Sequence, residues 1–247
     1  MSFDEQMSQA GITRIAFIRH ANAAPLLPDG SKMKPKGEYG TPHDWKTDDQ
    51  MRCLTEKGKA QAETARRWFI EGIGLHSNKV LVSSGARRAA ETLQIMAEKR
   101  SQDDASVSID LIWSLHPAGI ASKCEELFDK LNYGPLTRYY AEEGGEAALA
   151  EYGNIVLKEF QGLIASVADK PGDTISMFGH AVFLNAAAMQ FLKMWGFSST
   201  QAKDLTEINL GEAEGIILEK NNGVCSLKHM HCKMLAPEGV GVHPHFG

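Results

Sequence analysis

Short apolar runs that alternate with helical patterns constrain the fold of this chain most strongly. The runs suited to buried strands cover residues 12–18, 79–83, 107–113 and 173–178. The helical patterns lie near 55–73 and 86–99, within 117–168, and at 181–195. Strand–helix alternation of this kind places helices on both faces of a mostly parallel sheet. We therefore expect an α/β fold, a three-layer α/β/α sandwich with a mostly parallel central sheet.

The remaining segments favour one domain over residues 1–247, a length near the upper size of a single α/β domain. Residues 21–53 are rich in Pro, Gly, Asp and Lys and show no sustained period, which predicts a long loop or lid. The segments LTEINLG, EGIILEK and GVCSLKHMHC are separated by Gly and Asn-Asn-Gly. They predict short strands in a C-terminal β-rich segment at about 204–235, followed by a loose tail at 239–247.

The charge balance limits what the chain can bind. A net charge of -5 at pH 7 gives no general attraction to nucleic acid or to an anionic membrane surface. No segment approaches the roughly 18 uninterrupted apolar residues that a membrane span needs, and residues 1–11 contain no apolar signal region. We therefore expect a soluble, cytoplasmic protein with no nucleic-acid or membrane partner. The four cysteines are too few and too scattered for a disulfide framework, so free thiols are expected.

Histidine and arginine residues follow three of the predicted strands. The first strand ends in Arg19-His20, the second runs into Ser84 and Arg88, and the fourth leads to His180. Because ligands of an open parallel sheet bind beyond the carboxyl ends of its strands, these side chains should meet in one pocket. The helices that begin there also present unpaired backbone N–H groups. The sequence thus predicts an anion site.

Helix geometry separates Arg88 from its neighbour Arg87. Leu93 and Met96 belong to an apolar stripe that should face the core, and Arg88 flanks this stripe. Arg87 instead shares a face with Glu91, with which it can pair in solvent. We therefore expect Arg88 in the pocket and Arg87 on the outer face.

These motifs resemble the signature of the histidine phosphatase superfamily, the phosphoglycerate-mutase-like proteins. The family's Arg-His-Gly motif corresponds to residues 19–21, its Ser-Ser-x-x-x-Arg-Ala-x-x-Thr motif to residues 83–92, and its late Gly-His to residues 179–180. The Leu-Thr-x-x-Gly-x-x-Gln-Ala opening of the first helix at 54–62 and Gly-Gly-Glu at 144–146 also match. The matches follow the family's order over most of the chain.

The resemblance implies a phosphatase that hydrolyses phosphate monoesters, or phosphoryl groups on protein side chains, without metal or cofactor. His20 would be the nucleophile that becomes phosphorylated, and Arg19, Arg88 and His180 would hold the phosphoryl oxygens. The arginine charges would keep His20 neutral, whereas His180 would be a charged donor once phosphate is bound. The partner would be a small phosphorylated substrate or a phosphoprotein.

Residues beside the motifs are candidates for substrate contact. We expect Asn22, Ser84 and Ala181 to bind the substrate. Within the 21–53 segment, Trp45 could cap the pocket. Near Trp45 lie Lys32, Lys34, Lys36 and His43. A solvated loop is the favoured interpretation of this segment, and the alternative is that the lysines bind a second anionic group of the substrate.

The general acid is the main departure from the family pattern. The phosphoglycerate-mutase-like members carry a glutamate after the third strand, but Pro117 stands there, and Ala181 stands where the phytase-like branch has its acid. His116 is the first substitute, and the others are Glu142, Glu143 and Glu146. Two alternative functions therefore stay open: a catalytically weak, phosphate-binding or regulatory pseudoenzyme, and a phosphoglycerate-mutase-type phosphotransferase.

A metal site is not expected from the sequence. His229 and His231 would face the same side of a strand, with Cys232 next to them. However, the chain shows no compact set of four zinc ligands at standard spacing.

Overall fold

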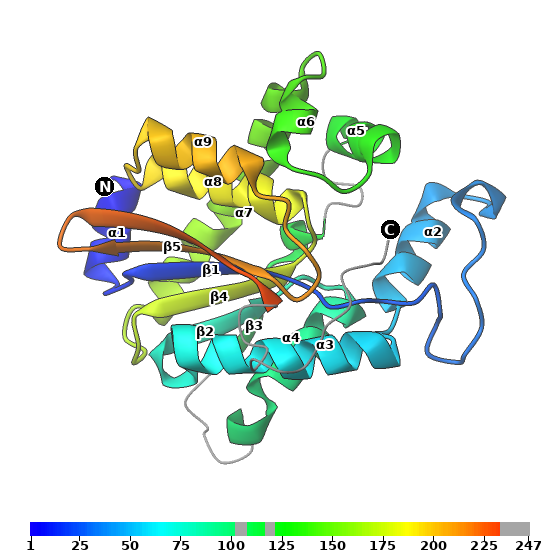
Figure 1. The fold of residues 1–247 in the computed structure, drawn as a ribbon, viewed down its shortest axis with the longest axis horizontal. Helices are drawn as coiled ribbons and strands as arrows, with labels where there is room; N and C mark the ends of the chain where they lie inside the picture. Colours follow the sequence, from blue (N-terminus) through cyan, green and yellow to red (C-terminus); the bar gives the residue numbers. More distant parts are fainter. Residues whose placement is uncertain (102–107, 117–121, 233–247) are drawn as a thin grey trace, which may run out of the picture.

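The computed structural model describes residues 1–101, 108–116 and 122–232 of the chain. Within these residues, one sheet has the strand order β3-β2-β4-β1-β5-β6 (Figure 1). The strands are β1 (Arg14–Arg19), β2 (Asn78–Ser83), β3 (Ser108–Leu111), β4 (Thr174–Gly179), β5 (Gly215–Asn221) and β6 (Val224–Met230). The first four strands of that order pair in parallel, whereas β5 runs antiparallel to both β1 and β6. The predicted, mostly parallel sheet is confirmed.

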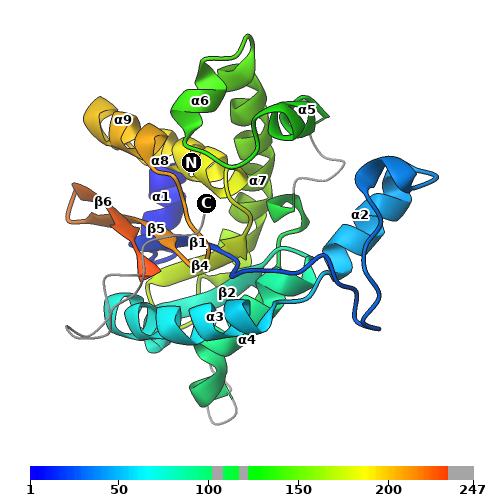
Figure 2. The same cartoon turned by 45° about the vertical axis from the view of Figure 1, so that its right-hand side comes forward.

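Helices cover both faces of the sheet (Figures 1 and 2). One face carries α3 (Glu56–Trp68), continued by a π-helical turn (Phe69–Ile73), and α4 (Arg87–Ser101). The other face carries α1 (Phe3–Gln9), α7 (Gly145–Val167), α8 (Phe183–Met194) and α9 (Ser199–Glu207), with α5 (Ser122–Leu131) and α6 (Leu136–Tyr140) beside them. Short 3₁₀ turns lie at Lys36–Glu38, Leu75–Ser77 and Trp113–Leu115. The three-layer sandwich is thus confirmed.

Alternate residues of the central strand β1 face two separate cores. Ile15 and Phe17 pack in the cluster that includes α7 and α8, whereas Ala16 and Ile18 pack in the cluster that includes α3 and α4. This alternation follows from the two-residue period of a strand. All four side chains are fully buried, as expected for a central strand covered on both faces.

The 21–53 segment differs from the sequence prediction, because it is not a structureless loop. It contains α2 (Pro42–Met51), whose first turn is capped by the Thr41 hydroxyl, which accepts the Asp44 backbone N–H. The helix is mostly polar, so no apolar period marks it in the sequence.

The C-terminal prediction is partly wrong. LTEINLG was expected to be a strand, but most of it belongs to α9 and the turn that follows it. A capping box between Ser198 and Gln201 begins this helix. The other two segments form the β5–β6 hairpin, which turns at Asn222 and Gly223 with φ of 50° and 80°. The tail at 239–247 lies outside the described residues.

The cysteines and the hydrophobicity of the helices agree with the sequence patterns. The four cysteines are free thiols, as predicted: Cys53, Cys124, Cys225 and Cys232. In the described part of the chain, none of the helices combines the length and apolar character needed to cross a bilayer.

Gly58, in the first turn of α3, packs against the backbone that follows His20. A Cβ added at Gly58 would lie 2.0 Å from the carbonyl oxygen of Asn22. Alanine normally favours a helix over glycine by up to about 1 kcal/mol. We nevertheless expect Gly58→Ala to lower the free energy of unfolding by about 1–3 kcal/mol, because the backbone at Asn22 must shift.

Gly162→Ala in α7 is the matched control, because an added Cβ there meets no atom within 4 Å. Urea unfolding curves should place this variant at or above the wild-type midpoint and Gly58→Ala below it. A Gly58→Ala midpoint equal to that of the wild type would show that the close approach carries no energetic cost.

Candidate active site

The carboxyl ends of the parallel strands bring four predicted site residues together. His20 follows β1, Arg88 lies in the first turn of α4 after β2, and His180 follows β4. The ring centroid of His180 lies 5.0 Å from that of His20 and 4.9 Å from that of His116. All four side chains are buried. The site is therefore a desolvated cluster of three imidazoles and one guanidinium.

His20 presents an unprotonated nitrogen to this cluster. Its Nδ1 lies 2.7 Å from the carbonyl oxygen of Ala21, an acceptor, so Nδ1 carries the ring hydrogen. Its Nε2 accepts the Nε–H of Arg88 at 3.3 Å. Burial, followed by the charge of Arg88, holds the pKa of His20 well below its ordinary value. His20 is therefore neutral at pH 7, with its lone pair on Nε2.

His180 is also neutral while Arg88 pairs with Asp49. Its Nδ1 lies 3.3 Å from Nη2 of Arg88, and a guanidinium can only donate, so Nδ1 is unprotonated. Its Nε2 lies 3.0 Å from the hydroxyl of Ser84 and donates to it. Burial and then the Arg88 charge lower the pKa of His180 well below its ordinary value. The charged form predicted for His180 applies to the phosphate-bound state.

Asp49 of α2 is the site residue that the sequence analysis missed. The backbone carbonyl of Asp49 accepts from Nη1 of Arg88, and its Oδ2 accepts from Nη2 at 2.9 Å. Its Oδ1 pairs with Arg52 at 3.0 Å, and its Oδ2 lies 3.0 Å from Nε2 of His116. No motif marks Asp49 in the sequence, because only the docking of α2 brings it here.

The carboxylate of Asp49 is ionised. Burial alone would raise its pKa, but the hydrogen bond from His116 and the charges of Arg88 and Arg52 outweigh burial. The pKa of Asp49 therefore lies well below its ordinary value. An ionised carboxylate only accepts hydrogen bonds, so Nε2 of His116 carries a hydrogen. The other ring nitrogen of His116, Nδ1, is buried and has no hydrogen-bond partner among the described residues.

A pocket of about 150 Å³ opens beside this cluster. It is lined by Lys36, Trp45, Asp49, Arg52, Arg88, His116, Glu125, Phe128, Asp129, Tyr133, His180, Ala181 and Phe183. Ion pairs of 2.6 Å between Lys36 and Asp129, and of 3.7 Å between Lys46 and Glu125, join the 21–53 segment to α5. This segment therefore covers the pocket, as a lid would. Of the cations considered in the 21–53 segment, Lys36 lines this pocket. The other three do not: Lys32, Lys34 and His43.

Of the other predicted site residues, some line the pocket and others only contact residues that line it. Ala181 lines the pocket. Ser84 does not line it, but its hydroxyl is hydrogen-bonded to His180, which does. The guanidinium of Arg19 lies 4.3 Å from the ring centroid of Tyr133, a lining residue, and donates to the carbonyl of Leu210 at 2.8 Å. His20 itself does not line the pocket, because Arg88 covers its Nε2.

Asn22 does not line the pocket. Its amide oxygen accepts from Thr55 at 2.7 Å, and its amide nitrogen donates to Glu212 at 2.9 Å. Its backbone N–H donates to Gln61. The structure therefore places Asn22 as a brace for the segment after His20, and its contact with substrate stays a prediction.

Two groups of charged residues lie outside the pocket. Arg87 pairs with Glu91 at 2.6 Å, as its helix face predicts. The acids considered as substitutes, Glu142, Glu143 and Glu146, do not line the pocket. Pro117 lies outside the described residues.

Among the residues that the structure describes, the one group of donor atoms that could hold a metal ion lies away from this pocket, at Glu214, His229 and His231.

A family model of the histidine phosphatase superfamily (branch 1) matches residues 15–197. The chain belongs to this superfamily. Among solved structures, this chain is similar to the phosphoserine phosphatase of Entamoeba histolytica in complex with 3-phosphoglyceric acid. That match has 16% identity and a TM-score of 0.51, and it covers 91% of this chain and 100% of the other. The native mycobacterial glucosyl-3-phosphoglycerate phosphatase gives 15% identity, a TM-score of 0.50, and coverage of 88% and 96%. A search of curated proteins finds no significant match.

Asp49→Asn tests whether the Asp49 carboxylate competes with an anion for Arg88. The substitution removes a negative charge 2.9 Å from Nη2 of Arg88 while keeping the shape of the side chain. We therefore expect inorganic phosphate to bind about tenfold more tightly to the variant, a change of about 1.4 kcal/mol. Calorimetric titration with phosphate at pH 7 and low ionic strength measures this.

Asp48→Asn is the matched control. It changes the net charge equally, but the Asp48 carboxylate accepts a hydrogen bond from Tyr39 at 2.9 Å and does not line the pocket. The phosphate affinity of this variant should stay within about twofold of the wild type. Equal affinities for the two variants would mean that Asp49 does not compete for Arg88.

Proposed function

We propose that this histidine phosphatase hydrolyses phosphate monoesters, without a metal ion, through a phosphohistidine intermediate on His20. The observation that carries the proposal is the lone pair on Nε2 of His20, which lies in a buried site beside Arg88 and His180. Phosphoryl transfer needs a nucleophile and cations that stabilise the charge on the equatorial oxygens. This cluster supplies both.

In the first step, the phosphoryl oxygens take the place of Asp49 on Arg88. Nε2 of His20 then attacks phosphorus, and the bond to the leaving oxygen breaks. The Nδ1–H bond of His20 to the carbonyl of Ala21 stabilises the charge that develops on the ring. The bound dianion also offsets the charge of Arg88, which favours protonation of His180. In the second step, water gives a proton to Nδ1 of His116 and attacks phosphorus, and the bond between phosphorus and Nε2 of His20 breaks.

We assign the proton for the leaving oxygen to His116. Asp49 accepts from Nε2 of His116 and thereby fixes the ring orientation. The ring lines the pocket, and its Nδ1 has no partner among the described residues. In its imidazolium form His116 carries a second hydrogen on Nδ1, and a leaving oxygen can take that proton.

The pocket favours a small phosphorylated substrate over a phosphoprotein. Its volume of about 150 Å³ suits a compact molecule, and Lys36 and Arg52 provide cations for a second anionic group. Aromatic walls from Trp45 and Tyr133 favour an apolar portion beside that group. The similar structures are named for phosphoserine and glucosyl-3-phosphoglycerate phosphatases, which agrees with a small substrate.

One observation supports the pseudoenzyme as a second candidate function. Arg88 already donates to Asp49, so an anion must displace a carboxylate of the chain itself before it can bind. A pocket that binds phosphate and releases none would be regulatory. Turnover decides between the two functions.

The first test is phosphate release from p-nitrophenyl phosphate in the presence of EDTA. We expect the wild type to turn over, and His20→Ala to be slower by at least about 10³-fold, because no other group can form the covalent intermediate. His43→Ala, at an exposed histidine of α2, is the control and should keep wild-type activity.

Wild-type activity that requires an added divalent ion would contradict the metal-independent mechanism. Folded wild type that binds phosphate but shows no release would favour the pseudoenzyme. Transfer between hydroxyls of one substrate with little release would favour the phosphotransferase.

A second test concerns His116. His116→Gln should lower kcat/KM for an alkyl phosphate by about 10²–10⁴-fold, because a poor leaving group needs a proton. An aryl phosphate, whose leaving group needs little help, should lose less than about tenfold. The measurement is the ratio of the two kcat/KM values for each enzyme. A purely structural role for His116 would lower both values equally and leave the ratio unchanged.

A further inference from the structure

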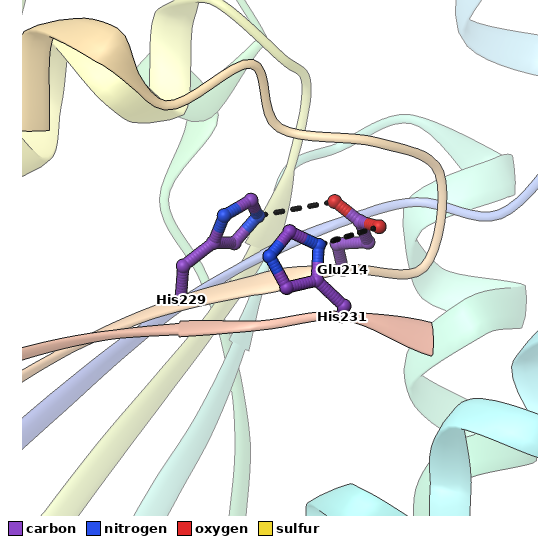
Figure 3. A group of neighbouring side chains, drawn as sticks. All are labelled: Glu214, His229 and His231. Carbon is purple, nitrogen blue, oxygen red and sulfur yellow. Dashed lines mark hydrogen bonds and ion pairs between the residues drawn. The ribbon is translucent and has the colours of Figure 1, made fainter. Parts of the chain in front are cut away.

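Glu214, His229 and His231 converge at the β5–β6 hairpin, which forms one edge of the sheet (Figure 3). Nε2 of His229 lies 3.1 Å from Oε2 of Glu214, and Nδ1 of His231 lies 3.2 Å from Oε1. The two imidazole centroids are 3.7 Å apart. One atom from each residue can be chosen so that all three lie within 4.8 Å of one another.

The hairpin register explains why these residues meet. His229 pairs with Ile216 across the β5–β6 ladder, and His231 follows the end of β6 on the same side as His229. Glu214 immediately precedes β5, 15 positions before His229. The sequence shows only the two histidines, and the antiparallel return of the chain supplies the carboxylate.

The carboxylate of Glu214 is fixed before any ligand binds. The backbone N–H of Gly211 donates to its Oε2 at 2.9 Å. A Cβ at Gly211 would lie 2.8 Å from Cδ of Glu214, so only glycine leaves room for the carboxylate in this position. Ala213, between them, has a positive φ of 56°. Supporting hydrogen bonds of this kind are typical of carboxylates that bind metal ions.

We propose that Glu214, His229 and His231 bind a divalent transition-metal ion, with Zn²⁺ as the best fit. Two imidazole nitrogens and one carboxylate oxygen are donors that Zn²⁺ prefers, whereas Ca²⁺ and Mg²⁺ prefer oxygen donors alone. Tetrahedral bonds of about 2.0–2.1 Å place neighbouring donor atoms about 3.3 Å apart. The nitrogens of His229 and His231 lie 3.1 and 3.2 Å from the two different oxygens of Glu214, and one atom from each residue lies within 4.8 Å of the other two. Small side-chain rotations would therefore bring both nitrogens and one oxygen to this spacing. The side chain of His231 is 45% exposed, which gives an ion access from solvent.

This site is structural and lies outside the catalytic pocket, because none of its three residues lines that pocket. The turn that carries Glu214 nevertheless supports the strand end of the active site. The Glu214 carbonyl accepts the backbone N–H of Arg19 at 3.0 Å, and the Leu210 carbonyl holds the Arg19 guanidinium at 2.8 Å. A bound ion would therefore clamp the β5–β6 hairpin onto the segment that positions Arg19. The inference does not depend on the proposed phosphatase activity.

The test is calorimetric titration of ZnCl₂ into the full-length, tag-free chain after treatment with a chelator. We expect one strong site in the wild type and at least about 100-fold weaker binding in His229→Ala and Glu214→Gln. His43→Ala is a control for exposed histidines, and the double variant His243→Ala/His245→Ala is a control for the tail. Both controls should bind as the wild type does. Equal binding by all variants, or loss only in the tail variant, would overturn the proposal.

Two further measurements keep the proposal testable if a substitution weakens the hairpin. Circular dichroism without metal first establishes that each variant is folded. Zn²⁺ at about 100 times its dissociation constant should then raise the wild-type unfolding midpoint by about 5–10 °C and leave that of Glu214→Gln unchanged. Co²⁺ should give visible absorption bands of a tetrahedral site in the wild type alone. An equal midpoint shift or equal bands in Glu214→Gln would overturn the proposal, whatever the phosphatase assay shows.

Discussion

The buried guanidinium of Arg88 is the interaction on which the rest of the active site depends. It is 5% exposed and reaches His20, His180 and Asp49. Removing such a charge from water costs several kcal/mol unless partners compensate for it. Burial, and then the charge of Arg88, lower the pKa of both imidazoles, so Nε2 of His20 retains its lone pair. The buried guanidinium favours an anion beside it, and Asp49 is that anion in this structure.

The ion pair between Asp49 and Arg88 links helix α2 to the proposed phosphoryl transfer. Asp49 and Trp45 both belong to α2, so the helix that covers the pocket also supplies the carboxylate on Arg88. In the proposed reaction, an incoming phosphoryl group replaces one anion with another, and the buried charge of Arg88 stays compensated throughout. The same carboxylate of Asp49 accepts a hydrogen bond from His116. Anion binding at Arg88 and the proposed proton donation by His116 are therefore coupled through one residue of α2.

The convergence of His20, Arg88 and His180 could be predicted from the sequence, because parallel strands end at one edge of a sheet and the period of α4 points Arg88 inward. Asp49 could not be predicted in this way. It lies in a polar helix without an apolar period, and only its docking against α4 brings it to Arg88. Glu214 could not be predicted either, because the register of β5 and β6 brings it to His229.

The elements that the sequence reveals least clearly are those that complete the site. The parallel core positions His20, Arg88 and His180, which belong to the superfamily pattern. By contrast, α2 supplies Asp49 and Trp45 to the pocket, and the turn before β5 holds Arg19 through Leu210 and Asn22 through Glu212. Differences between members of this superfamily in leaving group and substrate should therefore arise in these peripheral segments. Because Asp49 also holds Arg88 and His116, α2 links the choice of substrate to the proposed reaction on His20.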